Sequence, residues 1–340
     1  MVNCRICNNQ ELKTFLSLGE MPLANNFLKS LDDVPSEEKF PLGLCFCDQC
    51  KLVQLNYIVP PEKMFKDYVY VSSTSPSFRS HFEDMAKVVF SKFGLDGSSL
   101  VVDIGSNDGV LLKPFKSLGV QVVGVEPASN IAKIAEENGV ETINDFFNEG
   151  CVQKIIPEHG KADVITANNV FAHIPDIHEV VINVKSLLKE QGVFVIEFQY
   201  FVDTVKTMTF DNIYHEHFSY YTLTSLNYFF KNHEMQIFDV QHVDTHGGSL
   251  RVYVQKLEGE NPVNDVVGDI LDKESKFGVN EISLYLDFAT DVKKVKANLI
   301  EYIKNILLEG KKISGYGAPA KGNTLLNFCR INSSQIDYIV

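Results

Sequence analysis

The chain has 340 residues, of which 45% are apolar and 22% charged, a composition typical of a globular protein of about two to three domains. Its net charge of −13 argues against a general binder of nucleic acid or anionic membranes, because such proteins carry a basic surface. The N-terminus has no signal-peptide pattern, and no apolar run reaches the roughly 18 residues of a membrane span. We therefore expect a cytoplasmic protein that neither binds nucleic acid nor enters a membrane. A monomer is compatible with these patterns, which leave the oligomeric state open.

Two C-x-x-C pairs lie near the N-terminus, Cys4 with Cys7 and Cys47 with Cys50. Four thiolates complete the closed tetrahedral shell of a structural zinc ion, and a reducing compartment disfavours disulfides between them. The alternative is four thiols without a metal. Because residues 8–46 separate the pairs, we expect a small loop-rich lobe whose folding the zinc supports.

Residues 68–78 are rich in hydroxyl side chains and include Tyr70 and Ser73. Such a run is typical of a turn with a helix N-cap, or of a loop that faces a substrate. The apolar pattern of residues 78–90 then predicts a helix that leads into a central domain.

Residues 101–112 predict a buried strand, a tight glycine turn and the start of a helix. A second strand, 121–125, is followed by Glu126. This order is typical of the first half of a nucleoside-binding unit, in which the glycines admit the ligand to the backbone and the carboxylate binds the ribose hydroxyls.

The turn carries Asp103, Gly105, Asn107 and Gly109, which is not the G-x-G-x-x-G pattern of a dinucleotide fold. A carboxylate at Asp103 would repel a pyrophosphate but suits the cationic groups of S-adenosylmethionine, so this methyl donor is favoured over NAD. A plain turn of a parallel sheet stays open as an alternative, because Asp and Gly are common turn residues.

Further strands of an α/β sheet are predicted at 142–143, 162–167, 192–197, 235–243 and 249–257. Asp145 and Phe146 follow the first of them, where they can contact an adenine ring or simply form a helix N-cap and core. Asn168, Asn169 and His173 follow the second, at the edge where open parallel sheets bind ligands.

The segment 211–224 concentrates imidazole, carboxylate and phenol groups, in particular Tyr214, His215, Glu216 and His217. The two histidines suit a metal, but no third ligand lies nearby in the sequence. A polar aromatic patch of the core is a second alternative. Proton transfer is favoured, because the unperturbed pKa of an imidazole is close to neutral pH.

Residues 264–309 predict one or two helices, and a second glycine turn follows at Gly315, with Lys321 after it. This turn suits a phosphate, whereas a whole dinucleotide would need a following acidic residue that is missing. The apolar run 336–340 has no stop signal, so we expect this domain to continue beyond residue 340.

The motifs of the chain are the paired C-x-x-C, Tyr-Val-Ser-Ser, Asp-Ile-Gly-Ser-Asn-Asp-Gly, Asn-Asn-Val-Phe-Ala-His-Ile-Pro, Tyr-His-Glu-His-Phe-Ser-Tyr and His-Gly-Gly-Ser-Leu-Arg. Together they resemble the nucleotide-sugar C-methyltransferases. That family methylates a ring carbon of a deoxysugar on a nucleoside diphosphate, with S-adenosylmethionine as donor. The resemblance covers essentially the whole chain, although Asn107 stands where the family's donor turn usually has a second glycine.

The resemblance implies a Rossmann-like methyltransferase domain over 76–258, a zinc-binding domain over 1–75, and a C-terminal α/β substrate domain over 259–340. It implies that His217 is the base that removes a proton beside the sugar ketone, so that an enolate attacks the donor methyl. The residues expected to assist this base are Tyr214, Glu216 and Tyr70. The residues expected to bind the nucleotide sugar are Ser73, His173, Arg251 and Lys321.

Two other function classes stay open. A nicotinamide oxidoreductase would use the turn at Gly315, but the missing acidic residue and the carboxylate of Asp103 count against it. A zinc-stabilised binding module without catalysis would leave the Tyr-His-Glu-His cluster unexplained.

Overall fold

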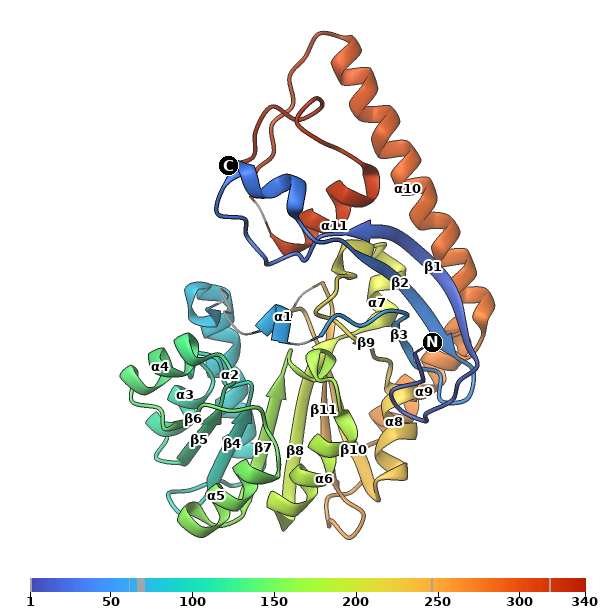
Figure 1. Cartoon of the computed structure of the whole chain (residues 1–340). Coiled ribbons are helices and arrows are strands. Elements are labelled where there is room, and N and C mark those ends of the chain that lie inside the picture. The colour runs from blue at the N-terminus through green and yellow to red at the C-terminus, as the bar shows by residue number, and fades with distance from the viewer. Residues whose placement is uncertain (1, 61, 66–70, 246, 318) are drawn as a thin grey trace.

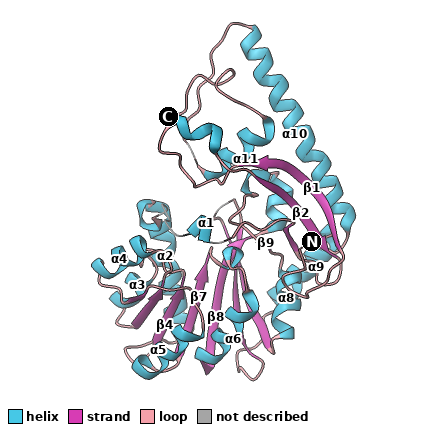
Figure 2. Ribbon diagram, in the orientation of Figure 1, coloured by secondary structure: helices cyan, strands magenta, loops and turns pink. Residues whose placement is uncertain are grey.

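The computed structural model describes residues 2–60, 62–65, 71–245, 247–317 and 319–340. These residues form two sheets, one of seven strands and one of four (Figures 1 and 2). The strands of the larger sheet, in spatial order, are β10 (Met235–Val243), β11 (Ser249–Lys256), β8 (Leu188–Gln199), β7 (Ala162–Asn168), β4 (Leu100–Ile104), β5 (Gln121–Val125) and β6 (Thr142–Ile143).

The larger sheet is parallel from β8 to β6, whereas β11 and β10 are antiparallel. Strand β4 is buried along its whole length. A continuous buried run is what a parallel strand needs when helices cover both faces of the sheet. The predicted Rossmann-like α/β fold is therefore confirmed.

Helices cover both faces of this sheet. Those on one face are α2 (Pro76–Lys92), α3 (Leu112–Ser117) and α4 (Ser129–Glu137). Those on the other are α5 (Glu149–His159), α6 (Ile177–Leu187) and α8 (Leu223–Asn232). The helix predicted over residues 78–90 is α2, whose buried face includes Phe82, Met85 and Val89.

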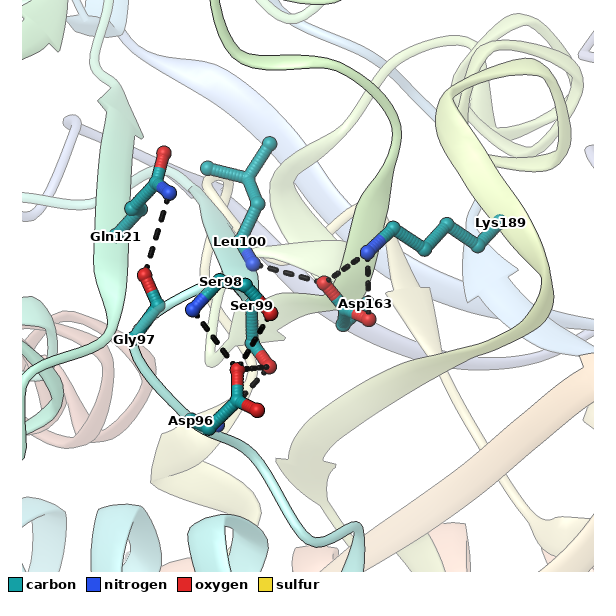
Figure 3. A network of polar contacts seen from close by, with 8 residues as sticks. All are labelled: Asp96, Gly97, Ser98, Ser99, Leu100, Gln121, Asp163 and Lys189. Carbon is teal, nitrogen blue, oxygen red and sulfur yellow. Dashed lines mark hydrogen bonds and ion pairs between the residues drawn. The ribbon is translucent and has the colours of Figure 1, made fainter.

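A polar network fixes the start of β4 (Figure 3). The carboxylate of Asp163 accepts a hydrogen bond from the Leu100 N–H at 2.8 Å and pairs with the Lys189 ammonium at 2.8 Å. Just before the strand, Asp96 accepts from the Ser98 N–H at 2.8 Å and closes a turn. The network holds the beginning of the strand whose other end carries the glycine turn.

The smaller sheet joins the N-terminal region to the segment that contains the histidine cluster. Its order is β1 (Leu12–Met21), β2 (Phe40–Cys47), β3 (Val53–Leu55) and β9 (Ser219–Tyr220), with neighbouring strands antiparallel. Strand β9 begins two residues after His217, so the predicted catalytic segment is anchored in the N-terminal sheet.

The C-terminal region is helical before its glycine turn. Residues 264–309 form two helices, α9 (Asp265–Phe277) and α10 (Ile282–Leu308), and α10 runs along β1 (Figure 1). Helix α11 (Ala320–Cys329) follows the turn, and a parallel bridge joins Gly315 to Ile339. The remaining short elements are α1 (Glu62–Phe65), α7 (Phe201–Thr207), η1 (Leu31–Ser36), η2 (Ser72–Thr74), η3 (Phe171–His173) and η4 (Phe210–Asn212).

Two hydrophobic cores cross the predicted domain boundaries. One contains Cys47 and Leu52 together with residues of the large sheet and its helices. The other contains Phe46, Phe218 and Tyr285, one from each predicted domain. The domain boundaries at 75/76 and 258/259 stay a prediction. In the structure, shared hydrophobic cores join the three regions. In the described parts of the chain, no helix combines the length and apolar character of a membrane span.

Candidate functional site

The four predicted zinc ligands converge. All four Sγ atoms lie within 4.8 Å of one another, with 3.3 Å between Cys4 and Cys50 and 3.4 Å between Cys7 and Cys47. Zn–S bonds of about 2.3 Å give tetrahedral S···S edges of about 3.8 Å, so the cluster fits a zinc ion after small shifts. Hydrogen bonds among the thiols lower the pKa of Cys47 and raise the pKa of Cys4 and of Cys50, because thiols this close share their protons. A metal ion would replace these protons.

The two knuckles repeat one backbone geometry. In each, the residue after the second cysteine donates its N–H to the carbonyl of the first cysteine at 2.9 Å, as Asn8 does to Cys4 and Lys51 to Cys47. Both donor residues have a left-handed backbone, with φ of 58° and 62°. Matching turns present two thiols each to a common point, which is the arrangement of a closed structural site.

The glycine turn after β4 is held by close approach and left-handed backbone. Gly105, Asn107 and Gly109 have φ of 66°, 50° and 79°. A Cβ on Gly105 would lie 2.7 Å from Cγ2 of Val170, so a side chain there would collide with the loop after β7. Asparagine is one of the few residues other than glycine that adopts this backbone readily, which explains Asn107 in place of a second glycine.

Glu126 closes this turn from the end of β5. Its Oε2 accepts from the Asn107 N–H at 3.0 Å, and its Oε1 accepts from the Ala128 N–H at 2.9 Å. Each carboxylate oxygen has a second lone pair for a ribose hydroxyl. Asp103 lies below the turn and accepts from the Thr166 hydroxyl at 2.5 Å. Burial raises the pKa of Asp103 to about 7 and also raises that of Glu126.

Polar groups around the turn are buried without a partner among the described residues. They are both amide atoms of Asn168, the hydroxyl of Ser106 and both carboxylate oxygens of Asp108. Buried polar groups normally find a partner, and a polar ligand over the turn would supply one. The turn therefore fits the nucleoside and amino acid groups of S-adenosylmethionine.

The other predicted donor residues lie on neighbouring strand ends. Asp145 and Phe146 follow β6; Asp145 is half-buried and accepts from the Phe146 N–H, and the Phe146 ring is half exposed. Asn169 follows β7 with a φ of 56° and donates its N–H to the Glu197 carbonyl at 2.7 Å. Their contacts with a donor stay a prediction.

The imidazole of His217 lies among aromatic rings. Its centroid is 4.2 Å from that of Tyr214 and 4.9 Å from that of His173. Its Nδ1 lies 3.1 Å from the carbonyl oxygen of Asn212. A carbonyl can only accept, so Nδ1 carries the proton and the lone pair of the neutral ring is on Nε2, the arrangement of a general base.

The neighbours of His217 have different environments. His215 is buried, and its Nε2 lies 3.3 Å from the carbonyl oxygens of both Phe40 and Pro41. Burial lowers the pKa of His215, so its neutral ring anchors the segment to the N-terminal lobe. Glu216 is 4% exposed and its Oε1 accepts from Asn25 Nδ2 at 2.6 Å. Among the described residues, the clusters that could hold a metal do not include His215 or His217.

All three predicted domains hold this segment. From the central region, Ala172 O accepts from the Phe218 N–H at 2.8 Å, and from the N-terminal sheet Leu55 N–H donates to Phe218 O at 3.0 Å. From α11, the Thr324 hydroxyl donates to Ile213 O at 2.9 Å. The candidate base therefore lies where the three regions meet.

The predicted substrate residues are distributed around this junction. Ser73 lies in η2, where the preceding Ser72 N–H donates to Asn107 Oδ1 at 2.8 Å, so the hydroxyl-rich loop touches the donor turn. Lys321 lies in the first turn of α11, and its charge partly opposes the increase that burial causes in the pKa of Asp211. Tyr70 lies outside the described residues.

Arg251 is buried rather than open to a ligand. It is 3% exposed, and its Nε and Nη2 donate to Glu197 Oε2 at 3.0 and 2.9 Å. His81 Nε2 lies 2.7 Å from the other oxygen of Glu197. Burial alone would raise the pKa of Glu197, but His81 and Arg251 outweigh it and lower that pKa. A substrate contact of Arg251 stays a prediction.

Sequence reasoning missed several residues of the site. Asp108 and Ser106 belong to the predicted turn, and their burial without partners could have been suspected from the motif. Asn25 and Arg5, which contact the histidine segment from the N-terminal lobe, carry no local signal, because their partners are far away in the sequence.

Three family models match the chain. They are described as "Putative zinc binding domain" over residues 4–65, "Methyltransferase domain" over residues 78–238 and "C-methyltransferase C-terminal domain" over residues 244–340. Together with the glycine turn and the sheet, they define an S-adenosylmethionine-dependent methyltransferase with a four-cysteine zinc-binding domain.

Among curated proteins, the chain is similar to C-methyltransferase NovU of Streptomyces niveus, with 37% identity over 335 residues, 98% of this chain and 80% of that protein. It is 31% identical over 113 residues to the ubiquinone biosynthesis O-methyltransferase of Glaesserella parasuis, which covers 30% of this chain and 46% of that protein. The chain therefore belongs to the C-methyltransferase family.

Solved structures show more distant likenesses. PH0226 from Pyrococcus horikoshii covers 57% of this chain and 97% of its own, at 15% identity and a TM-score of 0.44. Magnesium protoporphyrin IX methyltransferase (ChlM) from Synechocystis with bound SAH covers 57% of this chain and 91% of its own, at 12% identity and a TM-score of 0.41.

Proposed function

We propose that this C-methyltransferase acts on a keto-deoxysugar carried by a nucleoside diphosphate, of the 4-keto-6-deoxyhexose type. The observation that carries the proposal is the arrangement of His217, whose Nδ1–H donates to Asn212 O and whose ring lies against Tyr214 and His173. The lone pair of the neutral ring is then on Nε2, and the ring lies beside a phenol and an imidazole. A base of this kind is needed to methylate carbon, because a sugar carbon becomes a nucleophile only beside a carbonyl group.

The chemistry follows from this requirement. His217 Nε2 takes the proton α to the ketone, the C–H electron pair forms the enolate double bond, and the carbonyl π pair moves to oxygen. S-adenosylmethionine supplies the electrophilic methyl group, whose bond to sulfur breaks as the enolate carbon forms its new bond. The ketone forms again, S-adenosylhomocysteine leaves, and the His217 proton returns to water. General base catalysis is worth about 10²–10⁴ in rate.

We assign supporting roles to the neighbours of His217. Tyr214 or Tyr70 donates a hydrogen bond to the enolate oxygen, which would otherwise develop an unpaired negative charge. Glu216 accepts from a sugar hydroxyl or orients the base. Ser73 and His173 contact the sugar, and we assign the diphosphate to Lys321.

We assign the donor to the turn after β4. Glu126 binds the ribose hydroxyls, and Asp103 interacts with the cationic amino acid end. The glycines let the donor approach the backbone. The residues that follow β6 contact the adenine base, and those that follow β7 contact the methionine part. The full donor set is Asp103, Gly105, Asn107, Gly109, Glu126, Asp145, Phe146, Asn168 and Asn169. A cytoplasmic location agrees with thiolates that must stay reduced to hold zinc.

Transfer of a labelled methyl group tests this proposal. The protein is incubated with 4-keto-6-deoxy nucleotide sugars in turn and with methyl-¹³C S-adenosylmethionine, and the product is examined by NMR. We expect a new methyl signal coupled to a ring carbon next to the carbonyl. A methyl signal at the chemical shift of an O-methyl group, or no transfer to any keto-sugar by a protein that S-adenosylhomocysteine stabilises against heat, would contradict the proposal. Stabilisation by NADH alone would favour an oxidoreductase instead.

A further inference from the structure

Arg5, between the two cysteines of the first knuckle, reaches from the four-cysteine site into the site around His217. Its Nη2 donates to the carbonyl oxygen of Ile174 at 3.3 Å and to that of Pro175. The centre of the guanidinium lies 5.0 Å from the centroid of the Phe218 ring. A single side chain therefore contacts two segments that are distant in the sequence.

The contacted residues follow the two imidazoles directly. Ile174 comes after His173, and Phe218 comes after His217. The two segments also touch each other, because the Phe218 N–H donates to Ala172 O at 2.8 Å. Arg5 thus contacts the backbone that follows His173 and the side chain that follows His217, and the two imidazole rings lie 4.9 Å apart.

The backbone of Arg5 is held within the knuckle. Its N–H donates to Gln54 Oε1 at 2.9 Å, and its carbonyl accepts from His178 Nε2 at 3.0 Å. Gln54 is itself fully buried, and its Nε2 donates to Asn3 O at 3.1 Å. A metal on the two neighbouring thiols would immobilise the Arg5 backbone further, so the position of its guanidinium depends on the knuckle.

We propose that Arg5 is a positioning residue that couples the four-cysteine site to the substrate site by holding His173 and His217 side by side. The proposal rests on the proposed function for the roles of these two histidines. Arginine suits this position because one nitrogen of its planar guanidinium donates to two carbonyl oxygens while the guanidinium also lies over an aromatic ring. Lysine, a compact point charge, cannot do both at once.

The test compares Arg5→Ala and Arg5→Lys with Lys13→Ala. Lys13 is a matched control, because it pairs with Asp48 of the second knuckle at 2.7 Å but is half exposed. Four quantities are measured on the full chain: bound zinc, amide hydrogen exchange of peptides 169–178 and 213–220, the thermal shift caused by S-adenosylhomocysteine, and deuterium exchange of the keto-sugar α-proton in D₂O.

We expect Arg5→Ala to keep its zinc and its donor-induced thermal shift, while amide exchange becomes faster in both peptides. The α-proton exchange should fall about 10- to 100-fold, as it does when a residue that orients a functional group is removed. Arg5→Lys should lie between, and Lys13→Ala should match the wild type. If Arg5→Ala does not fold or loses its zinc, Arg5→Lys decides by the same measurements.

A zinc-loaded Arg5 variant whose two peptides exchange like those of the wild type would overturn the proposal, and so would an equal effect of Lys13→Ala. Faster amide exchange in both peptides, in a protein whose wild type exchanges no sugar proton, would support the positioning role and contradict the proposed function. The two ideas can therefore fail separately.

Discussion

The imidazole rings of His173 and His217 lie 4.9 Å apart with an interplanar angle of 43°. One belongs to η3, at the ligand-binding edge of the parallel sheet, and the other precedes β9 of the N-terminal sheet. The pair thus joins the edge that carries the donor turn to the segment held by the N-terminal and C-terminal regions. In the proposed reaction, the donor approaches from the first side and the keto-sugar lies beside the second.

Asn25 should be needed to orient Glu216. The 2.6 Å hydrogen bond from Asn25 Nδ2 satisfies a carboxylate that is only 4% exposed. Asn25→Ala should lower kcat about 10- to 100-fold, and Asn25→Asp should lower it further by adding a second carboxylate. Steady-state kinetics with labelled donor measures both. The neighbouring Asn26 is exposed, so Asn26→Ala is the control, and equal effects at the two positions would contradict this role.

Zinc removal should destabilise more than the N-terminal lobe. Three of the four cysteines are buried, and Cys4, Cys47 and Cys50 pack into the core that covers the large sheet. Metal analysis should find about one zinc per chain, because four thiolates make one closed shell. Chelation, or Cys47→Ser, should lower the midpoint of thermal unfolding. A metal-free chain with an unchanged midpoint would show that the thiols pack without a metal.

Gly105→Ala should cost more stability than Gly94→Ala. Both glycines have a left-handed backbone, with φ of 66° and 58°, so each substitution costs about 1–2 kcal/mol. Only at Gly105 would the new Cβ collide, at 2.7 Å from Val170 Cγ2, since nothing lies within 4 Å of it at Gly94. Urea unfolding measures the difference. In a Val170→Ala background the extra cost should shrink, because Cγ2 is removed and only the Val170 Cβ, at 3.1 Å, stays close. An unchanged extra cost would exclude the collision with Cγ2 as its cause.

Asp103 should make stability depend on pH. Burial raises its pKa to about 7, compared with about 3.9 in an unfolded chain, so the folded state binds this proton more tightly. The resulting stabilisation is complete below about pH 4 and is lost as the pH rises to about 7. Asp103→Asn removes this dependence. The free energy of unfolding of Asp103→Asn minus that of the wild type should therefore increase between pH 4 and pH 7, by at most about 4 kcal/mol.

Urea unfolding at pH 5 and pH 8 checks this prediction. A constant difference between Asp103→Asn and wild type would mean that Asp103 is ionised throughout the range. Thr166→Val is a useful comparison, because it removes the hydroxyl that donates to Asp103 without changing the charge.

The sequence predicted those features of the fold that depend on local pattern. The strand, turn and strand from β4 to β5 follow from apolar runs and two glycines, and the pairing of the four cysteines follows from their spacing. The same reasoning identified the edge that carries Asn168 and Asn169, because parallel strands end there.

Long-range contacts were beyond such reasoning. No local pattern shows that β9 joins the N-terminal sheet, that Arg5 contacts Phe218, or that Asn25 contacts Glu216. A charged residue also gives no sign of its partner in the sequence. The predicted substrate contact of Arg251 stays a prediction, and its pairing with buried Glu197 on the neighbouring strand could not be foreseen.

Deuterium exchange of the keto-sugar tests the central claim most directly. The wild type and His217→Asn are incubated in D₂O with S-adenosylhomocysteine and each candidate sugar, so that proton removal is seen without methyl transfer. Asparagine keeps a polar side chain but has no basic nitrogen. We predict that the wild type exchanges one proton next to the carbonyl and that His217→Asn does so at least about 100-fold more slowly. Equal exchange rates in the two proteins would contradict the assignment of His217 as the base.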